Sequence, residues 1–390
     1  MVLTGTNATG RSGWHDVTVP TPAPRIVIHV GLPKTGTTYL QGLLAGQRDR
    51  LLAGGVGYPL VRPGAMFHGA VEVRGSHAKF GLVAGEVAGT WAALCERARA
   101  FDGTTVLGHE VLAGATIAQI RAALAPLAGH EVHVVVTARD LGRQATAHWQ
   151  EEVKLGATWS FAEFERDQLR ADTGPDAGPD AGGARPHFWH AQDFADCLRR
   201  WGSAVGADRA HLVLGPPPGA PPEELWRRFA EAVGIDPALV DAAVPPANPS
   251  LGAAEVALLR AVNAELAGRL DPHTYNRVVK RGYAEGRLAG RPGPRPRTPH
   301  ELAGLLTEAT QRWVAQVAAA GHPVHGDLAD LAPVTAPEGS PHPDDVALPE
   351  DPVAVAQVLL AEADKRTGST SASGPQGGRW PRLIGRRRRG

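Results

Sequence analysis

The chain of 390 residues contains two cysteines, few aromatic side chains and no excess charge. Cys95 and Cys197 form no Cys-x-x-Cys motif and no disulfide pattern, which is typical of a reducing compartment. Forty basic and forty acidic residues give a formal net charge of +0, which argues against a nucleic-acid partner for the body of the protein. No apolar run approaches a membrane span, and the first twenty residues lack a hydrophobic signal core. We therefore expect a cytoplasmic protein.

The most informative stretch is RIVIHVGLPKTGTTYLQGLL, residues 25–44. Ile26, Val27 and Ile28 form a short β-branched run typical of a buried strand, and the leucines after residue 38 have helical spacing. A strand that turns directly into a helix presents free backbone N–H groups, which favour an anion. A turn that only caps the helix is the structural alternative. The residues predicted to bind a phosphate are Pro33, Lys34, Thr35, Gly36, Thr37, Thr38 and Tyr39.

The order of residues in this turn separates two kinds of phosphate loop. The nucleoside-triphosphate loop places its lysine directly after the second glycine, whereas Lys34 stands two residues before Gly36. The order Pro-Lys-Thr-Gly-Thr-Thr resembles the loop of sulfotransferases that use 3′-phosphoadenosine 5′-phosphosulfate (PAPS). The resemblance implies that Lys34 contacts the sulfuryl bridge, that residues 35–38 hold the 5′-phosphate, and that Tyr39 stacks on adenine.

A second strand is predicted within TTVLGHEVL, residues 104–112, and it is followed by His109 and Glu110. Ligands of open α/β sheets bind at the carboxyl ends of the strands. Sulfotransferases place their general base at this edge, as a histidine in many members and a glutamate in others. The sequence does not choose between His109 and Glu110, so either is a candidate base and the other its orienting partner. The structural alternative is a histidine at a strand end beside a glutamate that starts a helix.

A third strand, residues 132–137, leads through Arg139 into a helix with Asp140 near its N-cap. In sulfotransferases an arginine at this position holds the 3′-phosphate of PAPS, a task for which a planar guanidinium is suited. Pairing of Arg139 with a helix carboxylate is the alternative.

The resemblance is incomplete on the helix after Arg139. Family members carry a second 3′-phosphate ligand, a serine eight residues after the arginine, where this chain has Ala147. Thr146 or Arg143 is the candidate replacement. Trp149, Gln150 and Lys154, further along the helix, are candidates to face the acceptor, and a core position is the alternative for Trp149.

The remaining segments suggest how the chain is divided. Residues 1–24 are predicted to be a flexible leader, and residues 25–330 one sulfotransferase-like α/β domain. Within that domain, residues 170–187 contain GPDAGPDAGG and form a flexible lid or linker, and residues 50–80 are predicted to be loop with one short strand. Residues 331–390 are predicted to be an acidic, proline-rich linker followed by a basic disordered tail, with a short helix over residues 353–363 as one possibility.

Two basic segments have less specific interpretations. The late R-K-G-x-x-G motif of sulfotransferases is absent, and Lys280-Arg281-Gly282 stands in its place on what is predicted to be a solvated helix face. The arginine-rich tail either contacts an anionic membrane surface weakly or has no such role.

We therefore expect an α/β, P-loop-like three-layer fold with a central, mostly parallel sheet, flanking helices and disordered termini. The resemblance implies a sulfotransferase that moves a sulfuryl group from PAPS to a hydroxyl or amine, releases adenosine 3′,5′-bisphosphate and needs no metal. A small molecule, sugar or glycolipid could serve as acceptor. Two alternatives stay open: a P-loop kinase-like phosphotransferase and a non-catalytic nucleotide-binding descendant. The sequence specifies neither the acceptor nor the oligomeric state.

Overall fold

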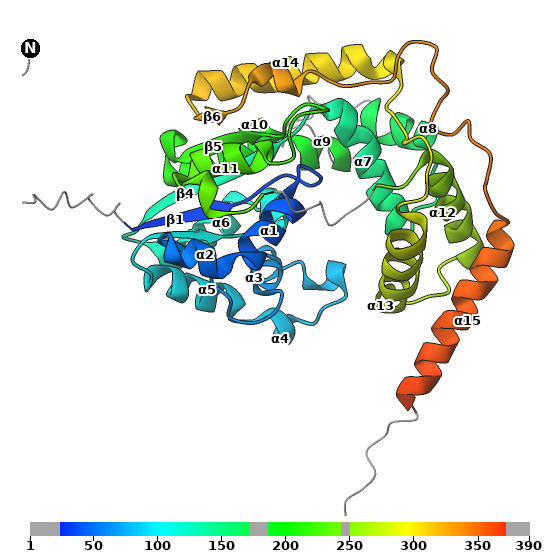
Figure 1. Cartoon of the computed structure of the whole chain (residues 1–390), viewed down its shortest axis with the longest axis horizontal. Coiled ribbons are helices and arrows are strands. Elements are labelled where there is room, and N and C mark those ends of the chain that lie inside the picture. The colour runs from blue at the N-terminus through cyan, green and yellow to red at the C-terminus, as the bar shows by residue number, and fades with distance from the viewer. Residues whose placement is uncertain (1–23, 172–185, 243–249, 372–390) are drawn as a thin grey trace, which may run out of the picture.

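The computed structural model describes residues 24–171, 186–242 and 250–371 (Figure 1). The predicted leader before residue 24, most of the predicted insertion and the basic end of the chain lie outside the described residues. The described strands form one six-stranded parallel sheet in the order β2-β3-β1-β4-β5-β6. Their bounds are β1 Arg25–His29, β2 Val56–Gly57, β3 Thr104–Leu107, β4 Glu131–Ala138, β5 Ala210–Leu214 and β6 Val324–His325.

Strand β1 lies at the centre of this sheet, where the direction of the chain changes. Ile28 pairs with Leu107 of β3 on one side and with Val134 of β4 on the other. The chain runs outward from β1 to β2, returns through β3 and then continues on the far side through β4, β5 and β6. The loops that leave β1, β3 and β4 therefore separate at the carboxyl edge, which is where such sheets bind ligands.

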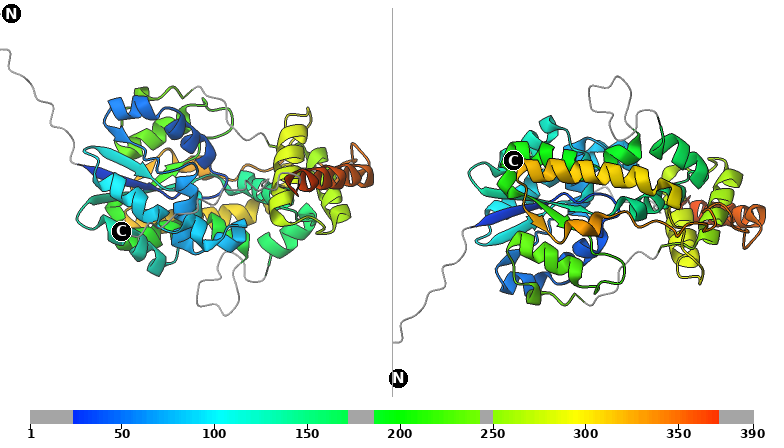
Figure 2. Two further views of the ribbon diagram at one scale, coloured as in Figure 1. Left: turned by 90° about the horizontal axis from the view of Figure 1, so that it is seen from below. Right: turned by 90° about the horizontal axis from the view of Figure 1, so that it is seen from above.

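Helices cover both faces of the sheet, as Figure 2 shows from two sides. The α-helices are α1 Thr37–Gly46, α2 Arg48–Ala53, α3 Ala65–Arg74, α4 Ala84–Val87, α5 Thr90–Arg99, α6 Ile117–Leu124, α7 Leu141–Lys154, α8 Phe161–Phe164, α9 His187–Gln192, α10 Phe194–Val205, α11 Glu224–Val233, α12 Ala253–Leu266, α13 Pro272–Tyr275, α14 Ala303–Ala320 and α15 Pro352–Ser371.

Shorter or wider helical turns connect these elements. They are η1 His77–Phe80, η2 Glu110–Gly114, η3 Ala125–Leu127, η4 Glu165–Leu169, η5 Ala207–Arg209, η6 Pro237–Leu239, η7 Asn276–Leu288, η8 His300–Leu302 and η9 Leu328–Leu331. Two of them, η4 and η7, are π-helical and continue α8 and α13 without a break.

The two faces of the sheet are filled by alternate residues of the same strands. In β4, Val134 and Val136 pack with the apolar residues of α5 and α10, whereas Val135 packs with those of α1 and α11. This alternation follows from the period of two in a strand, and burial on both faces explains why β4 is almost entirely β-branched. The prediction of an α/β three-layer fold is confirmed, and the sheet is parallel throughout its described strands.

A mainly helical region adjoins the sheet on the side of its carboxyl edge. Figure 1 shows α12, α13 and α15 gathered there beyond α7, away from the strands. Helix α15 packs against α12, and α7 contacts both α12 and η7. The helix that follows β4 is therefore the element that joins the sheet to this region.

The structure differs from the predicted linker after residue 330. Leu331 and Ala336 are buried, and the amide of Val334 donates to the Asp140 carboxylate at 3.0 Å. Residues 352–371 form α15, which contains the predicted short helix of residues 353–363 and buries Leu359 against the core. The proline-rich composition hid this packing, because a segment without periodic apolar residues can still bury isolated side chains. None of the described helices is long and apolar enough to cross a membrane.

Candidate active site

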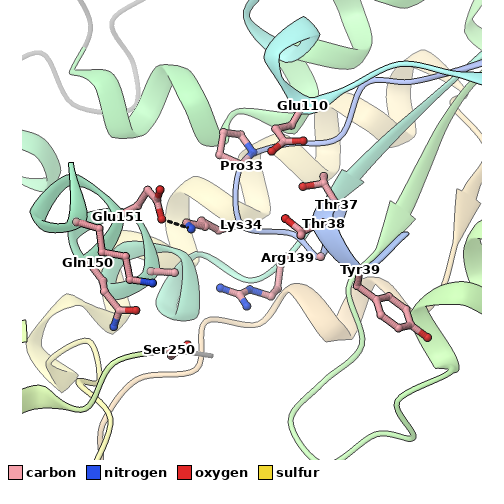
Figure 3. Close-up of a pocket in the computed structure, with 13 residues that line it drawn as sticks. Pro33, Lys34, Thr37, Thr38, Tyr39, Glu110, Arg139, Gln150, Glu151 and Ser250 are labelled. Carbon is pink, nitrogen blue, oxygen red and sulfur yellow. Dashed lines mark hydrogen bonds and ion pairs between the residues drawn. The ribbon is translucent and has the colours of Figure 1, made fainter. Parts of the chain in front are cut away.

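A cavity of about 370 Å³ opens at the carboxyl edge of the sheet (Figure 3). Its wall comes from the β1–α1 loop (residues 30–36), the first turn of α1, the end of β3, Arg139 after β4, and α7. Three cations and two carboxylates line it, so the cavity has an excess of positive charge. The lining residues are Pro33, Lys34, Gly36, Thr37, Thr38, Tyr39, Glu110, Arg139, Ala147, Gln150, Glu151, Lys154 and Ser250.

The β1–α1 loop adopts an unusual backbone that opens the N-terminus of α1 to the cavity. Gly36 has a φ of 94° and Lys34 a φ of 67°, a region that non-glycine residues rarely adopt. Gly36 is the N-cap of α1, and no side chain among the described residues caps this end. The first amides of a ten-residue helix therefore face the cavity with the positive end of its dipole.

Thr35 holds the β1–α1 loop in place and does not line the cavity. Its hydroxyl donates to the Leu32 carbonyl oxygen at 2.7 Å and lies 2.7 Å from the hydroxyl of Thr137 on β4. Gln144 of α7 donates to the Pro33 carbonyl oxygen at 2.7 Å. Of the predicted threonines, Thr37 and Thr38 are therefore at the cavity, while Thr35 positions the loop.

Lys34 extends from the loop to Glu151 of α7, as the dashed line in Figure 3 marks. The second oxygen of Glu151 accepts from Lys280 of η7 at 2.6 Å. Burial opposes ionisation of Glu151, but the two lysines outweigh it and lower its pKa to about 2. One carboxylate thus balances two ammonium groups. The predicted solvated position of Lys280 is wrong, because this ion pair draws its side chain inward.

Glu110 and His109 stand together after β3, but only Glu110 lines the cavity. Gln41 of α1 donates to the Glu110 carboxylate at 2.7 Å, and His109 Nδ1 lies 3.4 Å from the same oxygen. The His109 ring packs 5.3 Å from that of Phe67. His109 therefore lies beside Glu110 and does not line the cavity.

The ionisation of this pair follows from its surroundings. Burial raises the pKa of Glu110, yet His109, a backbone hydrogen bond and Gln41 together outweigh it and keep the pKa below its usual value. Burial lowers the pKa of His109, with Glu110 acting in the opposite direction. At neutral pH both groups are therefore in the form that accepts a proton.

Gly108 allows β3 to end close enough to β1 to place this pair. A Cβ atom on Gly108 would lie 2.3 Å from the backbone oxygen of His29, and its φ is +116°. His29 itself is buried beneath the loop, and burial lowers its pKa to about 4, so that its ring is neutral. A larger residue at position 108 would force the two strand ends apart.

Arg139 reaches the cavity from the end of β4 on the other side of β1. Its Nη2 donates to the Arg143 carbonyl oxygen at 3.2 Å, and its Nε is buried without a hydrogen-bond partner among the described residues. Burial lowers the pKa of Arg139 to about 10, so it stays charged at neutral pH. A buried, charged and incompletely paired guanidinium is suited to receive an anion.

The helix after Arg139 offers Ala147 and Lys154 to the cavity, and not Thr146. The Thr146 hydroxyl points back to the Arg143 carbonyl oxygen at 3.5 Å. Lys154 is 4% exposed and has no ion-pair partner within the part of the chain that the structure describes. Burial, together with the nearby Lys34, lowers its pKa. Lys154, a predicted acceptor-facing residue, lines the cavity about two helical turns beyond Ala147, whereas Thr146 does not line it.

Tyr39 stands at the opposite end of the cavity from Glu151. Figure 3 shows its ring directed away from Lys34, beyond Thr38. Its hydroxyl donates to the Ala242 carbonyl oxygen at 2.8 Å, which leaves one face of the ring along the cavity rim.

Sequence reasoning missed Gln41, Glu151 and Ser250. Gln41 stands four residues after Thr37 and so shares its helix face, a signal that was available. Glu151 gave no such signal, because its partner Lys34 lies more than a hundred residues away in the sequence. Ser250 gave none either, because it reaches the cavity from a different part of the chain.

The fold and the cavity define an α/β protein with a cationic ligand site at the switch point of a parallel sheet. Neither a protein-family model nor a curated protein matches the sequence. Among solved structures, the chain is similar to the crystal structure of a sulfotransferase from Alicyclobacillus acidocaldarius. The identity is 13% and the TM-score 0.36, over 64% of this chain and 98% of that one. This likeness is distant, so the function is argued below from the residues of the cavity.

Proposed function

We propose that the protein is a sulfotransferase that uses PAPS and transfers its sulfuryl group to an acceptor hydroxyl or amine. The observation that carries this proposal is a pair of anion-binding features in one cavity. Lys34 and the N-terminus of α1, which no described side chain caps, form the first, and Arg139 forms the second. A nucleotide with phosphate groups at both its 5′ and 3′ positions matches two such features.

The residues present fit this donor. The buried Nε of Arg139 lacks a partner among the described residues, as expected of a guanidinium kept for a phosphate. The Pro-Lys-Thr-Gly-Thr-Thr loop presents amides, two cavity-facing threonines and one lysine. PAPS, when bound, supplies an activated sulfuryl group whose transfer leaves a phosphate oxygen with increased negative charge.

The side chains of the chain have distinct tasks in this proposal. Lys34 and the first amides of α1 offset negative charge on the leaving oxygen, which is electrostatic stabilisation by groups already in place. Glu110, ionised and at the cavity wall, accepts the proton that the acceptor loses, and the hydrogen bond from Gln41 positions it. Glu151 holds Lys34 at the cavity until a bound anion competes for it.

A transfer assay with Lys34→Ala tests the proposal. The wild-type chain is incubated with PAPS that carries radioactive sulfur and with a panel of sugars, glycolipids and phenols, and transfer of the label to the acceptor is followed together with release of unlabelled adenosine 3′,5′-bisphosphate. Loss of one stabilising charge costs about 10²–10³ in kcat, so Lys34→Ala should be nearly inactive.

Lys79→Ala is the matched control, because Lys79 is an exposed lysine of η1 outside the cavity. It should retain wild-type turnover. Turnover in Lys34→Ala equal to that of the control would refute the assigned role of the lysine.

A further inference from the structure

A cluster of three side chains on α7 and α9 lies outside the cavity wall. His148 and Glu152 are four residues apart on α7, and His187 is the first residue of α9. His148 Nε2 lies 3.1 Å from His187 Nδ1 and 3.2 Å from Glu152 Oε1. The third side of the triangle, from His187 Nδ1 to Glu152 Oε1, measures 3.6 Å. Two nitrogens and one carboxylate oxygen thus converge on one point.

These separations match one face of a tetrahedral metal site. Zinc binds imidazole nitrogen and carboxylate oxygen at about 2.0–2.2 Å, and two such ligands at the tetrahedral angle are about 3.4 Å apart. The three observed distances fall on either side of that value. The three side chains would therefore need to move little to bind the ion.

Hydrogen bonding alone does not account for all three contacts. Each facing imidazole nitrogen carries at most one proton, and an ionised carboxylate carries none. If both nitrogens of His148 and His187 are protonated, their N–H groups face each other. If only one of these two nitrogens is protonated, the lone pair of the other nitrogen faces a lone pair of the Glu152 oxygen. A cation satisfies all three atoms at once, because every lone pair then points at it.

A second, independent observation concerns the other carboxylate oxygen. Glu152 Oε2 is buried and has no hydrogen-bond partner among the described residues. Burial of such an oxygen without a partner is costly, whereas coordination by the same ion would compensate it. The surroundings are apolar, since the rings of Phe164 and Phe188 lie 6.0 and 5.5 Å from that of His148.

We propose that His148, Glu152 and His187 bind a divalent transition-metal ion, Zn²⁺ by the class of its ligands. Mg²⁺ and Ca²⁺ prefer oxygen ligands, so a site with two imidazole nitrogens does not suit them. Three protein ligands leave the fourth position of a tetrahedral zinc site open. The His187 side chain is 54% exposed, so an ion can enter from solvent.

An ion bound at this position would also affect the cavity wall. Glu152 adjoins Glu151, which holds Lys34. The ion would join α7 to α9 and so fix the helix that forms one wall of the cavity. The amino-acid pattern does not indicate this link, because the third ligand follows the second by 35 residues.

Zinc titration of the full chain tests the site. The protein is first stripped of metal with a chelator, then titrated with Zn²⁺ by calorimetry and with Co²⁺ by visible absorption. We expect one ion per chain, a tetrahedral Co²⁺ spectrum and a higher Tm with Zn²⁺. Changing even an outer partner of a metal ligand lowers affinity by about 10–100-fold, so Glu152→Gln and His187→Ala should each weaken binding by at least about tenfold.

His300→Ala is the matched control, because His300 is an exposed histidine on η8. His187 is half exposed, so its variant keeps the fold, which circular dichroism verifies. Binding in both ligand variants that equals the control, or no binding by the wild-type chain, would overturn the proposal. None of these readouts depends on sulfuryl transfer.

Discussion

Among single residues, His109 and Glu110 are both in a proton-accepting state, but the fold gives them different surroundings. The Glu110 carboxylate reaches the cavity and accepts a hydrogen bond from Gln41. His109 packs against Phe67 and accepts from the Val111 amide at 3.3 Å. The sequence left the choice of base open, because two adjacent residues at a strand end differ only in the direction of their side chains.

The first prediction separates these two roles. Glu110→Gln should lower kcat by about 10²–10⁴, because the amide keeps the shape but accepts no proton. His109→Asn should lower kcat less, since His109 does not line the cavity. The measurement is the release of adenosine 3′,5′-bisphosphate from PAPS at saturating donor. A larger loss in His109→Asn than in Glu110→Gln would make the histidine the base.

At the scale of elements, α7 connects the sheet, the loop and the helical region. Asp140 caps it, Gln144 fixes the Pro33 carbonyl, and Glu151 holds Lys34 and Lys280. Gln144 and Glu151 are seven residues apart, so they occupy the same face of the helix. The position of Lys34 is thus set by α7 as much as by its own loop.

The second prediction concerns the cap of α7. The Asp140 carboxylate has 0% exposure, accepts from the Arg143 and Val334 amides, and pairs with the Arg143 guanidinium. Asp140→Ala should lower the free energy of unfolding by about 3 kcal/mol, because Arg143 loses its partner and two amides lose their acceptor. Urea unfolding gives the value.

Two variants calibrate this loss. Asp140→Asn keeps an acceptor oxygen and should cost less than Asp140→Ala. Asp236→Ala removes the cap of the exposed turn η6, and its cost should be the smallest. Equal losses in the three variants would mean that the buried network around Asp140 adds nothing to the cap.

The third prediction uses the pKa of Glu151, about 2 in the folded chain against 4.5 as its usual value. A lowered acid pKa stabilises the fold fully above 4.5, and the contribution disappears as pH falls from about 4.5 to about 2. The contribution at neutral pH is at most about 3 kcal/mol.

Urea unfolding of wild type and Glu151→Gln as a function of pH measures this contribution. The difference between the two proteins should be largest at neutral pH and should shrink through that window. A difference that stays constant from pH 7 to pH 2 would contradict the ion pairs with Lys34 and Lys280.

For the whole molecule, the sequence predicts the parts whose burial is periodic. Strands β1, β3 and β4 follow from β-branched runs, and the carboxyl ends of these strands meet because they are parallel. The two-residue strands β2 and β6 are too short for a periodic pattern. Helix α3 lies in a segment predicted as loop, because Gly64 and Gly69 obscure the helical spacing of its apolar residues in the sequence.

The unpredicted features depend on contacts between distant residues. Lys280 is 129 residues from Glu151, and Val334 is 194 residues from Asp140. No local pattern encodes such pairs. The packing of the segment after residue 330 and the inward position of Lys280 could therefore be recognised only from the three-dimensional structure.

The central claim is that two anion-binding features of one cavity receive a nucleotide phosphorylated at its 3′ and 5′ positions. A thermal-shift titration with adenosine 3′,5′-bisphosphate, beside ATP and ADP, tests it most directly. At about a hundred times its Kd, a ligand stabilises the fold by roughly 2.7 kcal/mol, which is a measurable rise in Tm. We predict that the bisphosphate stabilises the wild-type chain more than ATP or ADP, and that Arg139→Ala loses this preference. Equal or greater stabilisation by ATP, or no response to any of the three, would contradict the claim.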